Sequence, residues 1–299
     1  MRYYYPLEFL TVAFNIFSDN KEKSTSILEY AKKKGIKLEN PKFRYSNNEF
    51  ACDKKTNTIY KGMSCIKGLN KITGDKLYSL KDKTYPTFFD LLIDCKENSI
   101  GIADLTILIK LDYFSEFGSI GKLLKFVEIY NELYQKKMLK KDKEYSVKLL
   151  YLKQFCSKET EKQYSGFDSV ACLKSLYNKL ENIDIPIKDK INYQLQYYGY
   201  ITITDQNYPT EYWVVSDITD KSKNKFVEVY QISTGKKAKA KVRSSVFASK
   251  PFKVGDILQI LSFSKEGKWS LNQETQKWEK STTVFEDILS NYKINETLE

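Results

Sequence analysis

The spacing of apolar residues changes near residue 200, and this change limits the folds that the chain can adopt. Before residue 200, apolar residues recur at the spacing of amphipathic helices, for example between Leu123 and Met138. After it they alternate, as in residues 226–230 and 256–261. Turn residues separate several such short segments, an arrangement that is typical of a small barrel or sandwich. The sequence therefore predicts a multi-domain α+β protein with a helical N-terminal region and a C-terminal β-barrel.

Composition excludes several classes of active site. The 299 residues include no histidine, so Ser-His-Asp and Cys-His catalysis and His-ligated zinc or iron are ruled out. Five cysteines without a C-x-x-C pair argue against a zinc ribbon or a disulfide framework and favour a reducing compartment. No apolar run reaches about 18 residues, and the first residues lack the pattern of a signal peptide. We therefore expect a cytoplasmic protein with no membrane segment and no cofactor.

The chain is basic, with 49 lysines and arginines against 38 acidic residues and a formal net charge of +11. Arg2, Arg44 and Arg243 are its arginines, so the other 46 of the 49 basic residues are lysines. Lysine is a point charge on a long side chain, which suits attraction to phosphates better than the forked recognition of bases. An anionic partner is therefore expected, and charge that serves solubility alone is the competing interpretation.

A glycine-containing turn between two helical patterns is the first candidate site. Its sequence is Cys65-Ile66-Lys67-Gly68-Leu69-Asn70-Lys71. A turn of this kind directs backbone N–H groups outward at the start of the second helix, where the helix dipole also favours an anion. Lys67 and Lys71 add positive charge on both sides. The pattern predicts a phosphate site, although many helix pairs are joined by a similar loop that binds nothing.

The second candidate site is a predicted strand at residues 237–243, which has a cation at every second position. Because side chains alternate between the faces of a strand, these cations share one face. They are Lys237, Lys239, Lys241 and Arg243. The preceding strand places Phe226 and Tyr230 together on one face, and cations beside aromatic rings are what a groove for single-stranded nucleic acid requires. The alternative is an edge strand whose lysines prevent aggregation.

The pentamer Gln163-Tyr164-Ser165-Gly166-Phe167 lies in a polar stretch and is the third candidate site. A peptide with one glutamine and a terminal aromatic ring is suited to docking in a pocket on a partner protein. The competing interpretation is an ordinary loop.

The carboxylates of the sequence do not indicate a catalytic or metal site. Asp90 and Asp94 have the i,i+4 spacing of a helix, but the apolar residues around them indicate an ordinary amphipathic helix. No D-x-D pair and no glycine-rich phosphate loop ending in G-K-[ST] occurs. We therefore predict no catalytic residue and no bound metal.

Short landmarks in a shared order resemble the C-terminal half of the alpha subunit of bacterial DNA polymerase III, the C-family replicative polymerases. They extend over most of the chain, from about residue 3 to residue 265. The landmarks are Tyr5-Pro6-Leu7-Glu8-Phe9-Leu10, residues 30–36, the hairpin pattern of residues 50–60, Ile66-Lys67-Gly68-Leu69, Phe88-Phe89-Asp90-Leu91, residues 108–115, residues 194–200, Thr234-Gly235 and Val254-Gly255-Asp256.

The resemblance implies a tandem helix-hairpin-helix domain that contacts the backbone of duplex DNA, followed by an OB-fold. The residues then expected to hold duplex DNA are Lys67, Gly68, Leu69, Asn70 and Lys71. Those expected to hold a single strand are Phe226, Tyr230, Lys237, Lys239, Lys241 and Arg243. The pentamer with Gln163 and Phe167 occupies the place of the family's internal peptide that binds the sliding clamp.

Several departures from the family pattern bear on function. The palm domain that carries the polymerase carboxylates has no counterpart in this sequence. Asn70 stands where the first hairpin usually has a second glycine, and asparagine tolerates a left-handed backbone better than most residues. Gly166 replaces a bulky residue of the clamp peptide, and Asp112 replaces a glycine of the second hairpin.

We therefore expect a DNA-binding module that has no catalytic activity of its own. Its expected segments are a fingers-like helical segment at 1–48, a β-hairpin with the tandem helix-hairpin-helix domain at 49–160, a linker with the clamp-binding peptide at 161–200, the OB-fold at 201–275 and a tail at 276–299. One alternative is a fragment or split subunit of a C-family DNA polymerase that acts only with a palm-bearing partner. The other is an interaction platform for the sliding clamp or other replisome proteins.

Overall fold

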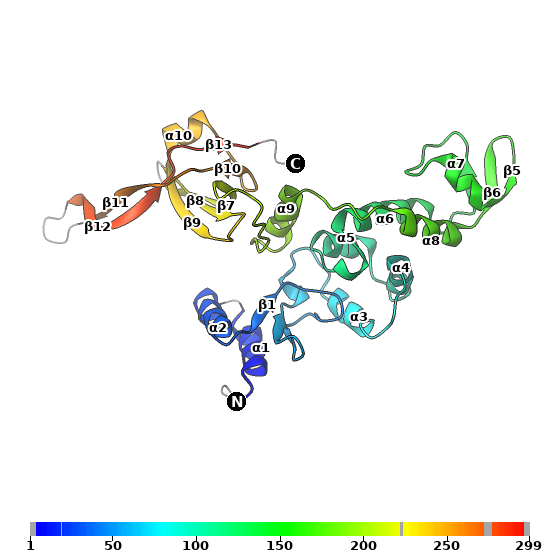
Figure 1. Ribbon diagram of the computed structural model, residues 1–299, viewed down its shortest axis with the longest axis horizontal. Helices are drawn as coiled ribbons and strands as arrows, with labels where there is room; N and C mark the ends of the chain where they lie inside the picture. Colours follow the sequence, from blue (N-terminus) through cyan, green and yellow to red (C-terminus); the bar gives the residue numbers. More distant parts are fainter. Residues whose placement is uncertain (1–3, 19, 222–223, 272–276, 296–299) are drawn as a thin grey trace. The chain divides into compact units, whose positions relative to one another are not determined.

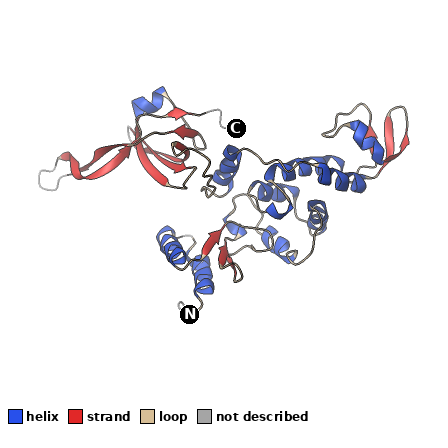
Figure 2. Cartoon of the chain, viewed as in Figure 1, coloured by secondary structure: helices blue, strands red, loops and turns tan. Residues whose placement is uncertain are grey.

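The computed structural model describes residues 4–18, 20–221, 224–271 and 277–295 (Figure 1). The chain divides into two compact units, Met1–Ile185 and Pro186–Glu299. Helices dominate the first unit, whereas a seven-stranded sheet dominates the second (Figure 2). The structure thus confirms the α+β order that the change in apolar spacing predicts.

Side-chain caps mark the start of several helices of the first unit. Thr87 and Asp90 form a capping box at the start of α4, and the Ser119 hydroxyl accepts a hydrogen bond from the Lys122 N–H at the start of α6. Among the described residues, no helix has the length and apolar character needed to cross a membrane. The helices of this unit are α1 (Pro6–Phe17), α2 (Lys21–Lys33), α3 (Thr73–Ser79), α4 (Phe88–Glu97), α5 (Ile102–Lys110), α6 (Ile120–Leu133), α7 (Leu149–Leu152) and α8 (Ser169–Lys179), with short 3-10 turns at Met63–Cys65, Ser115–Phe117 and Lys153–Phe155.

Two small sheets complete the first unit. The first has the strand order β1 (Lys37–Glu39), β3 (Thr58–Tyr60), β2 (Ala51–Asp53), and the second has the order β4 (Met138–Lys140), β6 (Gln163–Phe167), β5 (Cys156–Glu159). In the second sheet, β6 is the central strand and runs antiparallel to both neighbours. The pentamer at residues 163–167 is therefore a strand, because it forms a hairpin with β5 on one side and pairs with β4, which lies more than 20 residues earlier in the sequence, on the other.

An aromatic cluster holds the helical part of the first unit together. Phe88 and Phe114 are buried with their ring centroids 5.3 Å apart, and the ring of Phe43 lies 5.7 Å from that of Phe114. Beside this cluster the Arg44 guanidinium donates to both oxygens of Glu116, at 2.9 and 3.0 Å, and to two backbone carbonyl oxygens. Arg44 therefore has a structural role and is not free to contact a ligand.

The second unit is built on one mixed sheet with the strand order β11-β12-β9-β8-β7-β10-β13. Helix α9 (Ile187–Tyr197) precedes the sheet, and α10 (Ser244–Ser249) connects β9 to β10 along the chain. The strands are β7 (Tyr212–Lys221), β8 (Asn224–Gln231), β9 (Lys237–Arg243), β10 (Ile257–Gln259), β11 (Ser264–Leu271), β12 (Trp278–Ile288) and β13 (Lys293–Ile294).

The last two strands close this sheet on itself. The end of β12 pairs in parallel with β9, where Asp287 lies opposite Ala240, and β13 pairs with β10, where Ile294 lies opposite Leu258. Strands β9 and β10 are the two edges of the β9-β8-β7-β10 part of the sheet. The segment from residue 287 to residue 294 pairs with both of them and so joins these two edges. The result is a ring of strands around a common interior.

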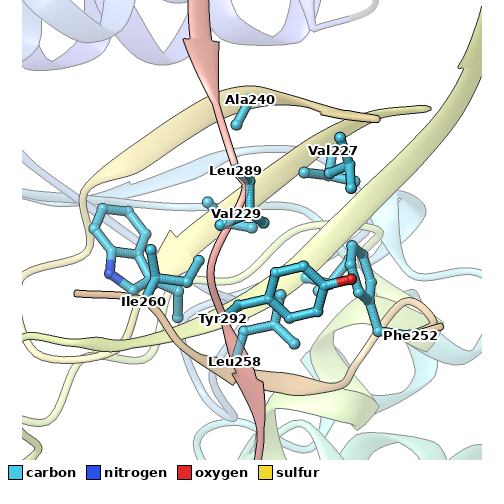
Figure 3. Close-up of a cluster of buried hydrophobic side chains, with 11 residues drawn as sticks. Val227, Val229, Ala240, Phe252, Leu258, Ile260, Leu289 and Tyr292 are labelled. Atoms are coloured by element: carbon cyan, nitrogen blue, oxygen red, sulfur yellow. The ribbon is translucent and has the colours of Figure 1, made fainter. Parts of the chain in front are cut away.

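Side chains from all parts of this ring fill its interior (Figure 3). Val227 and Val229 of β8 and Leu258 of β10 are fully buried there, together with Leu289 and Tyr292 from the closing segment. Residues 278–294 therefore belong to the sheet and its core, although the sequence places residues 276–299 in a tail. Their alternating pattern is weak because the hairpin part of β12 is largely exposed.

Candidate nucleic-acid interface

The turn at residues 66–72 connects the first 3-10 turn to α3 and presents most of the predicted duplex-binding residues on the surface. Among the described residues of this turn, Gly68 alone has a positive φ, of 80°. Lys67, Gly68, Asn70 and Lys71 are exposed, and Leu69 is half-buried. The structure therefore brings all five residues together on one exposed hairpin.

Asn70 does not adopt the left-handed backbone that the resemblance suggests for its position. Its side-chain oxygen instead accepts a hydrogen bond from the Ile72 N–H at 3.2 Å, and its carbonyl oxygen accepts one from the Thr73 N–H at 3.0 Å. Asn70 thus forms a local side-chain-to-backbone turn just before α3. Because these two N–H groups already have partners, a phosphate would depend more on the lysines and on N–H groups earlier in the turn.

Close packing behind the hairpin holds it in place. The Met63 N–H donates to the Asn47 carbonyl at 2.8 Å, and the Ser64 N–H donates to the Asn48 carbonyl at 3.2 Å. A side chain at Gly74 would collide with the amide end of Asn48, so the Asn48 side chain would have to move to admit one where this segment crosses α3. A cavity of about 450 Å³ between the two segments is lined in part by Leu69, Asn70 and Lys71.

A second hairpin, at residues 98–101, lies beside the first. Ser99 has a φ of 55°, Ile100 is buried and Gly101 caps α5, so this hairpin also has a left-handed residue followed by an inward apolar side chain. Helix α3, which follows the first hairpin, is linked to the second hairpin by a 3.0 Å hydrogen bond from the Lys76 ammonium to the Ser99 carbonyl, and to α5 by a 2.5 Å hydrogen bond from the Thr73 hydroxyl to Asp104. The sequence gives little sign of this second turn, because serine does not indicate a left-handed backbone as glycine does.

Asp112 lies outside both hairpins, contrary to the position that the resemblance assigns to it. It follows α5 directly and has a φ of 61°, the left-handed conformation with which many helices end. Its carboxylate accepts a 2.7 Å hydrogen bond from the Lys42 ammonium. Asp112 therefore lies at the end of a helix, in a conformation that favours glycine, and not in either hairpin.

In the second unit, the cationic row of β9 is largely neutralised by carboxylates. Lys239 pairs with Glu228 at 3.0 Å, Lys241 pairs with Glu286 at 2.9 Å, and Arg243 pairs with Glu266. The Lys241 pair is the most enclosed of the three, since its side chains are 17% and 16% exposed. Lys237 is exposed, and it has no ion pair within the described part of the chain.

Tyr230 was expected to stack on bases, and the structure shows that this expectation is wrong. Its side chain is 3% exposed, and its hydroxyl donates to the Ile203 carbonyl at 3.0 Å. Ile191 of α9 and Ile201 cover this end of the strand pair. The ring shares a face with the cationic row, since Tyr230 lies opposite Lys237, but at this end the face is packed and cannot receive a ligand. Phe226, at the other end of β8, is half-buried.

The clamp-binding interpretation of residues 163–167 is also contradicted by the structure. Phe167 is 6% exposed, so its ring is part of the protein core and cannot enter a pocket on another protein. Gly166 has a φ of 64°, and a side chain there would collide with Ser157 of β5. Gln163, which lies opposite Lys140, is half-buried in the same strand. The pentamer therefore serves as the central strand of its own sheet.

The acidic pair considered in the sequence has structural partners. Asp90 caps α4 with Thr87, and Asp94 accepts hydrogen bonds from Lys83 at 2.8 Å and from the Tyr85 hydroxyl at 2.7 Å. Within the described ranges, no three cysteine or acidic side chains lie close enough together to hold a metal ion.

Comparison with known proteins identifies the region that contains both hairpins. A family model described as a helix-hairpin-helix motif matches residues 35–122. DNA polymerase III subunit alpha of Ureaplasma parvum serovar 3 is 30% identical to the chain over 137 residues, which are 46% of this chain and 14% of that protein. The matched part of the chain thus spans about a seventh of its relative. These matches confirm the expected helix-hairpin-helix motif and show that the chain is related in part to a DNA polymerase III alpha subunit.

Proposed function

We propose that this protein is a non-catalytic DNA-binding module related to a replicative DNA polymerase. The observation that carries the proposal is the exposed hairpin with Lys67 and Lys71, which lies beside the second hairpin inside the region that matches a helix-hairpin-helix motif. Backbone N–H groups and lysines can contact phosphates of a duplex without reading its bases. Binding to duplex DNA is therefore expected to be nearly independent of base sequence.

The barrel of the second unit is proposed to be an OB-fold that binds a single strand. In support, β7, β8, β9, the closing segment of β12 and β13, and β10 form a five-stranded ring. Lys237 and Lys239 are exposed on this ring, and Phe226 is half-buried opposite Lys241. Lys239, Lys241 and Arg243 contribute less positive charge than Lys237 because each is paired with a carboxylate.

Fluorescence anisotropy with labelled duplex, single-stranded and primed DNA tests this function. If about six to eight phosphates are contacted, the logarithm of the affinity should fall with the logarithm of salt concentration, by about 0.9 per duplex contact and about 0.7 per single-strand contact. Replacing Lys67 and Lys71 by alanine should flatten the duplex slope by about 2 and leave single-strand binding unchanged. Lys32→Ala with Lys33→Ala, which removes exposed charge from α2, is the matched control.

Two results would contradict the proposal. One is the absence of measurable DNA binding at low salt. The other is an equal loss of duplex affinity in the Lys67/Lys71 and Lys32/Lys33 variants, because binding would then follow net charge and not the hairpin.

A second function, as part of a polymerase that needs a palm-bearing partner, is favoured by the surface of α1. Phe9, Val12 and Ile16 lie on one side of this helix and are 39%, 57% and 65% exposed. An apolar stripe of this kind on a protein surface commonly marks a protein contact. Under this alternative, the chain alone extends no primer, and a palm-bearing partner restores extension unless Val12 and Ile16 are replaced by charged residues.

A further inference from the structure

The segment between α6 and α8 is rich in lysines that no carboxylate neutralises. Residues 134–168 contain nine lysines and five carboxylates, a net charge of +4, and they form the β4-β6-β5 sheet and α7. Within the described part of the chain, carboxylates pair with Lys141 and Lys143, and the other seven lysines of this segment have no ion pair. Four of the eleven net positive charges of the chain thus lie in this short segment.

Strand register puts two of the unpaired lysines on one face of the sheet. Lys140 of β4 lies opposite Gln163, and Lys158 of β5 lies opposite Ser165, as does Met138. Directly paired residues and residues two apart on a strand share a face, so these five side chains lie together and form what we call the open face. Both lysines are exposed, and Met138 is 51% exposed. The open face therefore has two cations and, at these five positions, no carboxylate.

The opposite face of this sheet is packed and neutralised. Leu139 is fully buried there, and Glu159 lies on the same face, opposite Tyr164. The Lys141 ammonium is 2.5 Å from a Glu159 carboxylate oxygen and 4.8 Å from the centroid of the Tyr164 ring. The alternation of the strands thus separates a neutral ion pair on one face from free positive charge on the other.

The remaining carboxylates of the segment lie outside the strands. They are Asp142 and Glu144 after β4, Glu161 between β5 and β6, and Asp168, which caps α8. Asp142 and Glu161 line a cavity at the end of the sheet, where Lys140, Lys141 and Lys162 outnumber them. Lysine therefore predominates both on the open face and at its end.

The chemistry of the open face indicates which part of a nucleic acid it can contact. None of its five side chains is aromatic, so the face cannot stack on bases. Lysine ammonium groups attract phosphates as point charges, and serine and glutamine side chains donate hydrogen bonds to phosphate or sugar oxygens. A duplex presents phosphates while its bases remain stacked inside, so the face fits the backbone of a duplex.

The open face is close along the chain to the second hairpin. The end of α6 packs against that hairpin around a cavity of about 250 Å³, which is lined by Ile100 of the hairpin and by Tyr134. The Lys96 ammonium lies 4.5 Å from the centroid of the Tyr134 ring. The chain from Tyr134 to Lys140 spans at most about 20 Å, which is roughly six base pairs of a duplex. One duplex can therefore reach from the hairpins to the sheet.

We propose that the open face extends the duplex-binding surface of the two hairpins, with Lys140 and Lys158 each contacting a phosphate of the same duplex. This inference rests on the proposed duplex binding and adds a second set of contacts to it. Because the contacts are made to phosphates, they add affinity without adding sequence preference.

Fluorescence anisotropy of the full chain with a labelled duplex of about 20 base pairs, two helical turns, tests the proposal across a salt series. Lys140→Ala with Lys158→Ala should flatten the log–log slope of affinity against salt by about 2, as expected for two lost phosphate contacts. Lys148→Ala with Lys153→Ala removes two exposed, unpaired lysines of the same segment that lie outside the sheet, and it should leave the slope unchanged.

Two further measurements separate contact from folding and show whether one duplex is shared. Lys140→Arg with Lys158→Arg keeps both charges and should keep the wild-type slope, and circular dichroism checks that the alanine variant is folded. Combining the alanine changes at Lys140 and Lys158 with those at Lys67 and Lys71 should flatten the slope by about 4. The stoichiometry should be one duplex per chain.

The possible outcomes distinguish this inference from the proposed function. An unchanged slope in the Lys140/Lys158 variant, with a flattened slope in the Lys67/Lys71 variant, overturns the inference and leaves the proposed function intact. Equal flattening by the control variant, or two duplexes bound per chain, also overturns it. No duplex binding by the wild type at low salt overturns the inference together with the duplex part of the function. A loss confined to single-stranded DNA overturns the inference alone.

Discussion

Gly68 determines the shape of the first hairpin through its backbone. Its φ of 80° is costly for any residue with a side chain, by about 1–2 kcal/mol. Space is not the obstacle, because an added Cβ would meet only the Ile107 Cδ1 atom, at 3.9 Å. Gly101 of the second hairpin differs, since its φ is −73° and nothing lies within 4 Å of an added Cβ.

Gly68→Ala is therefore expected to lower the free energy of unfolding by about 1 kcal/mol. Gly101→Ala should change it by less than about 0.5 kcal/mol, because reduced freedom of the unfolded chain offsets the loss of a good capping residue. Urea unfolding monitored by circular dichroism measures both values. Equal destabilisation by the two substitutions would show that backbone conformation is not the cause.

Asp94 links stability to pH at the residue scale. The Lys83 ammonium and then the Tyr85 hydroxyl, which donate to its carboxylate, lower the pKa of Asp94. Since the folded pKa lies below the unfolded one, the stabilisation is complete above the unfolded pKa, near 4, and is lost as pH falls through the folded pKa.

Asp94→Asn should accordingly cost about 0.5–1 kcal/mol at pH 7, a modest value because Lys83 is 55% exposed. The difference between the variant and the wild type should shrink as pH falls from 5 towards 2. Urea midpoints measured across this range provide the test, and a difference that stays constant with pH would argue against the ion pair.

At the scale of elements, β6 shows how strand pairing overrides a local pattern. Gln163–Phe167 is polar and contains a glycine, and nothing in these residues alone specifies a central strand. The strand forms because β4 and β5 pair with it from both sides and because Phe167 enters the core. Its role is therefore set by residues outside the pentamer.

Phe167→Ala is expected to lower the free energy of unfolding by about 3–5 kcal/mol through loss of a buried ring. Gln163→Ala, at a half-buried polar position of the same strand, should cost less than about 1 kcal/mol. Thermal unfolding of both variants measures the contrast. A Phe167→Ala variant as stable as the wild type would reopen the interpretation of this segment as a docking peptide.

At the scale of the whole molecule, the two units have separate cores. The cluster around Val227, Leu258 and Tyr292 lies wholly within the second unit, and the cluster around Phe88 and Phe114 lies within the first. A unit that contains its own core can fold independently. The two proposed DNA-binding activities should therefore be separable.

Residues 1–185 and residues 186–299 produced as separate fragments should each unfold cooperatively. The first fragment should retain duplex binding and the second should retain single-strand binding, each within about threefold of the full chain, because each keeps the contacts proposed for it. Calorimetry and anisotropy measure these two properties. Non-cooperative unfolding of either fragment would show that its core is incomplete.

The sequence by itself determined the features that depend on nearby residues. The helical and alternating periods determined the order of the two units, the glycine at position 68 determined the first hairpin, and alternation placed Lys237 and Lys241 on one face of β9. Each of these follows from the geometry of a few consecutive residues, which the chain specifies locally.

Only the tertiary structure decided which of these groups are free to act. Lys241 is neutralised by Glu286, 45 residues away, and Arg243 by Glu266, 23 residues away. Tyr230 is covered by a helix that precedes its strand, whereas Lys140 and Lys158 share one open face through strand register. Burial and ion pairing join residues that are distant along the chain, so no local pattern could distinguish an occupied side chain from one that is available to a ligand.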